Sequence, residues 1–404
     1  MPRGRPRKSA TSGKTDKERY LEEQKQKKDI LKLVQSPDSF MEKVDKLGVS
    51  PINDPLRLSE DAPKPRRLYT KTALDRILSI KGGIPAGRSV ELFGEFGSGK
   101  TQIINTMLVE SEGLCILIDT EHTFDPDRFK ELCEARGKDP ADVNERLLLY
   151  QPLDWIEQIA IIRNLPQFDK DGNYLDVGIV AVDSLMKLFG QAPELSGRAN
   201  LSFRQSTIGQ MLAMLRTYAK RHNSILVWSS QIRSRPVNTM FAAPESKVAS
   251  QGGPTVSHEG DYRIFLRKGP RNIRYARLVD SIDLPLMEVP FILDVSGIRD
   301  IPDPGERLKA MEQSEEYGKK FLSARLGNTP PGKKYYMEAL RRGVITPEEA
   351  KQYLDEKDIA KVLMQIDPDY ARNADSEIKI EEIVSEEDVP PVEEVVEEEV
   401  EEIV

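Results

Sequence analysis

The clearest chemical signal in the sequence is a short stretch with the pattern G-x-x-x-x-G-K-T. It follows the apolar run SVELF and precedes the helix-like TQIINTML. Glycines let consecutive backbone amides face phosphate oxygens, and a helix N-terminus favours negative charge. Lys100 is expected to reach the β and γ phosphates and Thr101 to ligate Mg²⁺. The pattern predicts a nucleoside triphosphate site made of Gly94, Glu95, Phe96, Gly97, Ser98, Gly99, Lys100, Thr101 and Gln102.

Hydrolysis of such a triphosphate also needs a second metal ligand and a base that orients the attacking water. Asp183 ends the apolar run VGIVAVD, where a metal-binding carboxylate is expected. Glu121 follows the run LCILIDT and is the candidate base, although Asp119 could be the base instead or a structural cap. Gln231 ends the run SILVWSSQ as either a functional residue or a simple strand cap. The carboxyl ends of parallel strands share one edge, where open α/β sheets bind ligands.

The surrounding sequence predicts the elements that position these residues. From Leu68 onward, short apolar runs alternate with amphipathic stretches, which is a strand-helix rhythm. Runs such as GIVAVD are apolar at every position, as in strands buried on both faces of a parallel sheet. After Arg233, the runs YRIFLRK, IRYARLVDS and VPFILDV predict an antiparallel extension. We therefore expect an α/β core over residues 66–303, with a mostly parallel central sheet flanked by helices.

Four further regions flank this core. Residues 1–15 are basic and lack apolar periodicity, so we expect a disordered arm. Residues 16–65 predict a charged helix followed by a proline-rich linker. Residues 304–374 predict a small helical appendage, in which Thr346-Pro347-Glu348-Glu349 has the form of a capping box. Residues 375–404 are rich in Glu and Val and are expected to form a disordered acidic tail.

Composition excludes several classes of protein. The chain has 404 residues and two cysteines, so it can build neither a disulfide framework nor a four-cysteine zinc site. No run approaches the roughly 20 apolar residues of a membrane helix, and MPRGRPRK lacks the apolar core of a secretion signal. We expect a cytoplasmic protein without membrane contact, associated with the nucleoid, or a nuclear one in a eukaryote. The net charge of −8 combines a basic N-terminal arm with the acidic tail. The arm suggests an anionic polymer as partner, and the tail suggests a basic partner or competition with that polymer. The alternative for each is a solvated, disordered end.

Several stretches resemble the RecA superfamily, and within it the archaeal RadA and eukaryotic strand-exchange recombinases. The resemblance covers residues 66–302, and its motifs are specific in combination. They are GEFGSGKTQ, LIDTEHTFDPDRF, LSGRANLSFRQ, MFAAPESK, GGPTVSH and YARLVDSIDLP. The resemblance implies a RecA-like ATPase that uses ATP and Mg²⁺, binds single-stranded DNA and exchanges it with a homologous duplex.

The resemblance also implies roles for individual residues. Lys100, Glu121 and Gln231 would be catalytic, with Gln231 sensing the γ-phosphate, and Arg128 would stack on adenine. His258 and the segment from Asp280 to Pro285 would approach ATP from a neighbouring subunit, so the site would be completed in a homo-oligomer, a filament or a ring. The implied DNA-binding residues in two loops are Arg198, Arg204, Arg233, Arg235 and Phe241.

The terminal regions depart from the resembled family. Residues 1–65 lack the glycine-rich turns of its duplex-binding N-terminal domain and its Phe-x-x-Ala polymerisation motif. Pro2 to Lys8 instead resemble an AT-hook, in which Arg3 and Arg5 would enter the minor groove of double-stranded DNA; the alternative is a plain basic tail. The acidic tail is either a polyanion that competes with DNA or a contact for accessory recombination proteins. The alternatives to a strand-exchange recombinase are a recombination mediator that uses ATP as a switch and a ring-forming helicase.

Overall fold

The computed structural model describes residues 15–25 except 19 and 23, 66–234 except 80, 248–314 except 251, and 331–366. The chain divides into two compact units, Met1–Ile301 and Pro302–Val404. The predicted DNA-binding residues Arg3, Arg5, Arg235 and Phe241 and the whole acidic tail lie outside the described residues. Within them, no helix has the length and apolar character needed to cross a membrane.

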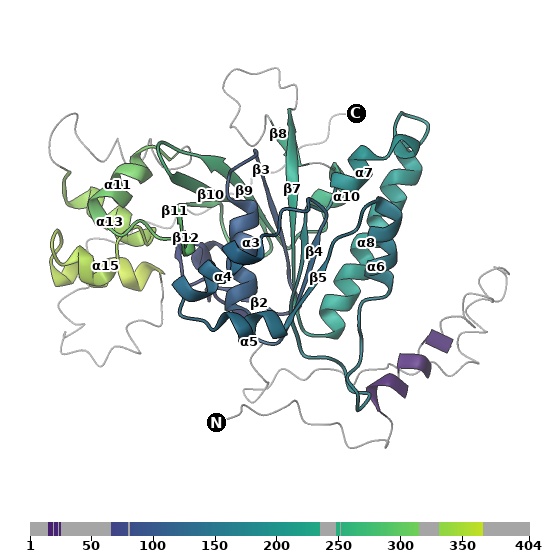
Figure 1. Cartoon of the computed structure of the whole chain (residues 1–404). Helices are drawn as coiled ribbons and strands as arrows, with labels where there is room; N and C mark the ends of the chain where they lie inside the picture. The colour runs from purple at the N-terminus through teal and green to yellow at the C-terminus, as the bar shows by residue number, and fades with distance from the viewer. Residues whose placement is uncertain are drawn as a thin grey trace, which may run out of the picture. The chain divides into compact units, whose positions relative to one another are not determined.

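A ten-stranded sheet, counted over the described residues, forms the centre of the first unit (Figure 1). Its order is β12-β11-β10-β9-β3-β7-β6-β4-β5, with β8 paired to β7. Neighbouring strands from β9 to β5 are parallel and those from β9 to β12 are antiparallel, which confirms the predicted mixed sheet. The strands are β3 (Ser89–Gly94), β4 (Leu114–Asp119), β5 (Leu147–Tyr150), β6 (Val177–Asp183), β7 (Ile225–Ser234), β8 (Val248–Ser250), β9 (Tyr262–Lys268), β10 (Ile273–Ser281), β11 (Met287–Asp294) and β12 (Gly297–Arg299). A separate pair consists of β1 (Arg67–Leu68) and β2 (Ile84–Pro85).

Helices cover both faces of this sheet because alternate side chains of each strand point in opposite directions. Val227 of β7 belongs to a cluster that includes residues of α3, α4 and α5, whereas Trp228 belongs to a cluster with residues of α6 and α8. Figure 1 shows these two sets of helices on opposite sides of the strands. Every residue of β6 is buried, as its uninterrupted apolar run predicts. The helices are η2 (Ala73–Ile77), α3 (Lys100–Glu110), α4 (Pro126–Ala135), α5 (Pro140–Glu145), α6 (Trp155–Arg163), α7 (Lys187–Gln191), η3 (Pro193–Leu195), α8 (Leu201–Arg221) and α10 (Pro254–Ser257).

The second unit is helical over its described residues. It contains α11 (Pro304–Glu312), α13 (Lys333–Arg341), α14 (Pro347–Ala350) and α15 (Glu356–Ile366). Its own apolar core includes Leu308, Tyr335 and Val362. At the start of α14, Thr346 Oγ1 accepts from the Glu349 amide at 3.2 Å, and the Thr346 amide donates to Glu349 Oε2 at 2.8 Å. These bonds form the capping box expected from the sequence.

A short N-terminal segment contacts the first unit. Residues 16–18, 20–22 and 24–25 are helical. The Lys17 amide donates to Gly172 O at 3.0 Å, and the ring of Tyr20 meets that of Phe168 edge to face at 5.5 Å. The rest of the predicted charged helix and the linker lie outside the described residues.

Candidate active site

The glycine-rich stretch forms the turn between β3 and α3, as its pattern predicts. Gly99 caps α3 with a φ of 106°, a left-handed conformation that favours glycine. Among the described residues no side chain caps this helix end, so its first amides point into the turn without a side-chain acceptor there. A Cβ on Gly94 would lie 2.2 Å from the carbonyl oxygen of Leu266 on the neighbouring strand. The turn therefore packs closely against β9 and presents backbone amides suited to phosphate.

Lys100 lies buried at the start of α3. Its Nζ donates to Gly94 O at 2.9 Å and to Glu95 O at 2.8 Å, so the side chain folds back over the turn. Burial lowers the pKa of Lys100, and the nearby carboxylates of Asp183 and Glu121 oppose that shift. A phosphate group in the turn would supply a stronger partner than the two carbonyls.

A chain of hydroxyls joins α3, β6 and β7. Thr101 Oγ1 donates to Asp183 Oδ2 at 2.6 Å, and Ser229 Oγ donates to Asp183 Oδ1. Burial raises the pKa of Asp183, while the hydrogen bonds from Ser229 and Thr101 lower it in part. Hydroxyl and carboxylate oxygens are hard donors that suit Mg²⁺. Thr101 and Asp183, distant in sequence, are thus brought together as a fitting pair for this ion.

The two carboxylates after β4 have different surroundings. Asp119 is buried, and its Oδ1 accepts from the Glu121 amide at 3.1 Å. Its Oδ2 accepts from the Phe124 amide at 3.0 Å and from Gln151 Nε2 at 3.1 Å. The side chain of Glu121 is partly exposed and accepts no hydrogen bond from any described residue. These contacts favour Asp119 as the structural cap and Glu121 as the candidate base.

Strand β7 lies between β3 and β6, so its carboxyl end borders the phosphate turn on one side and Asp183 on the other. Gln231 pairs in register with Gly94. Two buried oxygens beside the turn, Ser98 Oγ and Gln102 Oε1, have no hydrogen-bond partner among the described residues. The Ser98 hydroxyl can donate to a phosphate oxygen and so fits the predicted triphosphate, whereas the Gln102 oxygen only accepts and needs a donor other than phosphate.

Arg128 is positioned by α4, whose N-cap Asp125 accepts from the Arg128 amide at 3.2 Å. Its guanidinium donates to the carbonyls of Asp294 and Val295, each at 2.8 Å, and to Glu131 at 3.2 Å. The side chain therefore lies against the turn between β11 and β12. Within the described residues it makes no hydrogen bond or ion pair with the phosphate turn.

The predicted subunit-bridging residues lie at the opposite edge of the sheet. Ser281 pairs with Tyr262, which pairs with Val90 near the start of β3, so Asp280 and Pro285 are far along the strands from the phosphate turn. His258 precedes β9 at the same edge. All three predicted residues are exposed: His258, Asp280 and Pro285. The structure does not bring them to this subunit's own site.

The described candidates for DNA contact belong to loops around α8 and β7. Arg198 is exposed between η3 and α8. Arg204 lies on the first turns of α8, where its Nη1 donates to Leu195 O at 3.3 Å. Arg233 pairs with Ala249 where β7 and β8 form an antiparallel extension beyond the sheet.

Sequence reasoning missed three residues near the turn. Ser229 contacts Asp183, and its place two residues before Gln231 on one strand face could have indicated it. Arg274 Nε donates to Gly97 O at 3.2 Å, and a Cβ on Gly97 would lie 3.3 Å from Lys268 Nζ. Lys268 and Arg274 come from paired antiparallel strands, and no local motif marks them.

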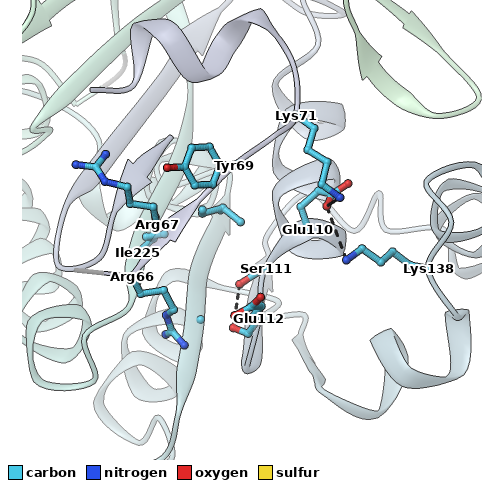
Figure 2. A pocket seen from close by; sticks show the side chains of 11 residues that line it. Arg66, Arg67, Tyr69, Lys71, Glu110, Ser111, Glu112, Lys138 and Ile225 are labelled. Atoms are coloured by element: carbon cyan, nitrogen blue, oxygen red, sulfur yellow. Dashed lines mark hydrogen bonds and ion pairs between the residues drawn. The ribbon is translucent and has the colours of Figure 1, made fainter. Parts of the chain in front are cut away.

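A pocket at the amino-terminal edge of the sheet has a different character. Figure 2 shows Lys71 and Lys138 directed toward Glu110, at the end of α3. Glu110 pairs with Lys71 and Arg136, each at 2.7 Å, and with Lys138 at 3.8 Å. The three cations share this one carboxylate, and their ion pairs hold the end of α3 in place.

Comparison with known families decides the relationship. The sequence model of the Rad51 family matches residues 68–301, more than half of the chain. The chain belongs to the Rad51 family. The predicted RecA-type, RadA-like relationship is therefore confirmed, and the match covers the sheet and its helices. The helical second unit begins where the match ends.

Curated relatives of this Rad51-family chain include three archaeal proteins named DNA repair and recombination protein RadA. The one from Cenarchaeum symbiosum is 33% identical over 250 residues, which are 60% of this chain and 59% of the relative. The one from Metallosphaera sedula is 33% identical over 255 residues, 61% of this chain and 76% of the relative. The one from Aeropyrum pernix is 35% identical over 236 residues, 56% of this chain and 70% of the relative.

Proposed function

We propose that this chain is a DNA-dependent ATPase that binds single-stranded DNA with ATP and promotes homologous pairing and strand exchange in recombination and repair. One observation carries the proposal: Lys100, the Thr101–Asp183 pair and Glu121 surround a phosphate turn that is in register with Gln231. The names of the RadA relatives support recombination as the process.

In the proposed reaction, Lys100 exchanges its two carbonyl partners for the β and γ phosphates, and Glu121 orients and deprotonates the attacking water. Thr101 and Asp183 hold Mg²⁺, which supplies charge neutralisation for the phosphates when bound. Arg128 must leave the carbonyls of Asp294 and Val295 to stack on adenine.

DNA contact belongs to the two loops beyond the sheet. Arginine suits phosphates because its planar fork is always charged and binds two oxygens at once. An aromatic side chain in such a loop can stack on bases. Gln231 would couple the γ-phosphate to the loop after β7, because Gln231 lies on β7 and the strand leads directly into that loop. The proposed DNA-contacting residues are Arg198, Arg204, Arg233, Arg235 and Phe241.

Oligomerisation would complete the site. His258, Asp280 and Pro285 are exposed at the edge opposite the phosphate turn, an arrangement suited to a head-to-tail contact with the next subunit. The basic arm with Arg3 and Arg5 would bind duplex DNA. These partners place the proposed activity inside the cell, in the cytoplasm with the nucleoid or in a nucleus.

Two substitutions test the ATPase assignment. Lys100→Ala should abolish binding of a fluorescent ATP analogue, because the phosphates lose their buried cation. Glu121→Gln should bind the analogue and DNA normally but lose ATP turnover by at least about 100-fold, because only the base is lost. Normal turnover in Glu121→Gln would contradict the role of Glu121, and analogue binding by Lys100→Ala would contradict the site itself.

A mediator that uses ATP as a switch is the second candidate function. It is favoured by one sequence feature, the lack of a Phe-x-x-Ala motif in residues 1–65. Electron microscopy with single-stranded DNA and a non-hydrolysable ATP analogue separates the candidates. A helical filament supports the recombinase, a closed ring supports a helicase-like motor, and discrete particles support the mediator.

A further inference from the structure

Two adjacent serines near the end of β7 have opposite surroundings. Ser229 and Ser230 are both fully buried. Ser229 Oγ donates to Asp183 Oδ1, whereas Ser230 Oγ has no hydrogen-bond partner among the described residues. The alternation of side chains along a strand explains the difference. Ser229 has the orientation of Val227, on the side of α3, and Ser230 that of Trp228, on the side of α8.

Asp183 therefore receives one hydroxyl on each carboxylate oxygen. Thr101 approaches Oδ2 from α3 and Ser229 approaches Oδ1 from β7. Two donors from different elements fix the rotation of the carboxylate about its Cβ–Cγ bond, whereas a single donor would leave that rotation open. By donating its hydrogen to Asp183, Thr101 also keeps its oxygen lone pairs available for a cation.

We propose that Ser229 is a positioning residue that orients Asp183 for the Mg²⁺ that accompanies the nucleotide. The inference rests on the proposed function and extends it to a residue outside the recognised motifs. Hydrogen-bond partners of metal-binding side chains change metal affinity by roughly 10- to 100-fold when they are removed. Ser229 is buried and directed at Asp183, so it has the geometry of such a partner.

The test measures the binding of a fluorescent ATP analogue to the full-length chain as Mg²⁺ is titrated. Ser229→Ala should raise the Mg²⁺ concentration at half-saturation roughly tenfold or more. Its affinity for the analogue in EDTA should match that of the wild type, because Lys100 and the phosphate turn are unchanged. Ser229→Thr, which restores the hydroxyl, should keep the wild-type half-saturation.

Ser230→Ala is the matched control, since it removes the neighbouring buried hydroxyl that does not contact Asp183. A half-saturation in Ser229→Ala within about twofold of the wild type, or an equal rise in Ser230→Ala, would overturn the inference. If Ser229→Ala does not fold, Ser229→Cys fills the site with a larger atom and a weaker donor and must itself raise the half-saturation. A wild-type chain that binds no analogue overturns the proposed function and this inference together, whereas normal binding with an unchanged Mg²⁺ requirement overturns this inference alone.

Discussion

Asp119 and Glu121 illustrate how two carboxylates two residues apart come to have different roles. Asp119 ends β4 with both oxygens committed to hydrogen-bond donors, so it fixes the path of the following turn. Glu121 lies beyond that turn with an uncommitted, partly exposed carboxylate. The sequence places both at a strand end but cannot rank them, because the decisive donor Gln151 comes from the end of another strand. These hydrogen bonds support Glu121 rather than Asp119 as the candidate base.

Substitutions at these two positions should differ in their effects on stability and on ATP turnover. Asp119→Asn would place an NH₂ group against one of the N–H donors that now bind the Asp119 carboxylate. This lowers the free energy of unfolding by about 1–3 kcal/mol. ATP turnover should fall with it, because the turn that carries Glu121 loosens. Glu121→Gln should change stability by no more than about 0.5 kcal/mol. Thermal unfolding and ATPase assays on both variants check this, and a stable Asp119→Asn protein would remove the structural role.

At the scale of elements, the sequence pattern predicted the features that depend only on residues close together in the chain. The apolar run of β6, the turn before α3 and the capping box of α14 each depend on neighbouring residues, and all three are present. Alternation along the strand could have indicated Ser229 but not its partner Asp183, and nothing local indicates that Arg128 contacts the β11–β12 turn. Both contacts depend on which strands become neighbours. Strand order is set by packing of the whole core and leaves no mark at a single position.

The capping box of α14 gives a pH-dependent prediction. Burial raises the pKa of Glu349, but hydrogen bonds from Thr346 and Arg307 outweigh it, so the net pKa is lowered. A lowered pKa stabilises the helical unit at neutral pH, and this contribution is lost as pH falls through the folded-state pKa. Glu349→Gln should therefore reduce protection from hydrogen exchange in residues 331–366 at pH 7 by roughly two- to fivefold, equivalent to about 0.5–1 kcal/mol.

The difference between wild type and Glu349→Gln should shrink as pH falls below about 4.3, the ordinary pKa of glutamic acid. Glu348→Gln is the control, because Glu348 and its partner Lys351 are both largely exposed. Equal protection at pH 7, or a difference that persists at pH 3, would show that the charge of Glu349 is not the cause.

At the scale of the whole molecule, charge is distributed by position along the chain. Arginine and lysine dominate the first residues, and Lys379 is the one basic residue after Ala374 among many glutamates. Such a polyanion can compete with DNA for the chain's own basic loops, since both are attracted by the same charges. The alternative is a contact for accessory proteins, which would leave DNA binding unchanged.

Truncation after Ala374 distinguishes these roles. If the tail competes, the truncated chain should bind single-stranded DNA more tightly than the full-length chain at low salt. The gap should close as salt or Mg²⁺ screens the glutamates. A tail of the same length with glutamine in place of glutamate is the matched control and should behave like the truncation. Equal affinities of truncated and full-length protein at low salt and low Mg²⁺ would exclude competition.

The two apolar clusters on opposite faces of the sheet have no side chain in common. Strand β3 and helix α3, which flank the phosphate turn, contribute to one cluster, and α8, which carries Arg204, contributes to the other. A small molecule bound against α8 would therefore disturb the side that we propose to contact DNA, without occupying the volume of the nucleotide. Such a compound would act as a non-competitive inhibitor with respect to ATP, and resistance to it would arise through residues such as Met211 and Leu215 rather than through the phosphate turn.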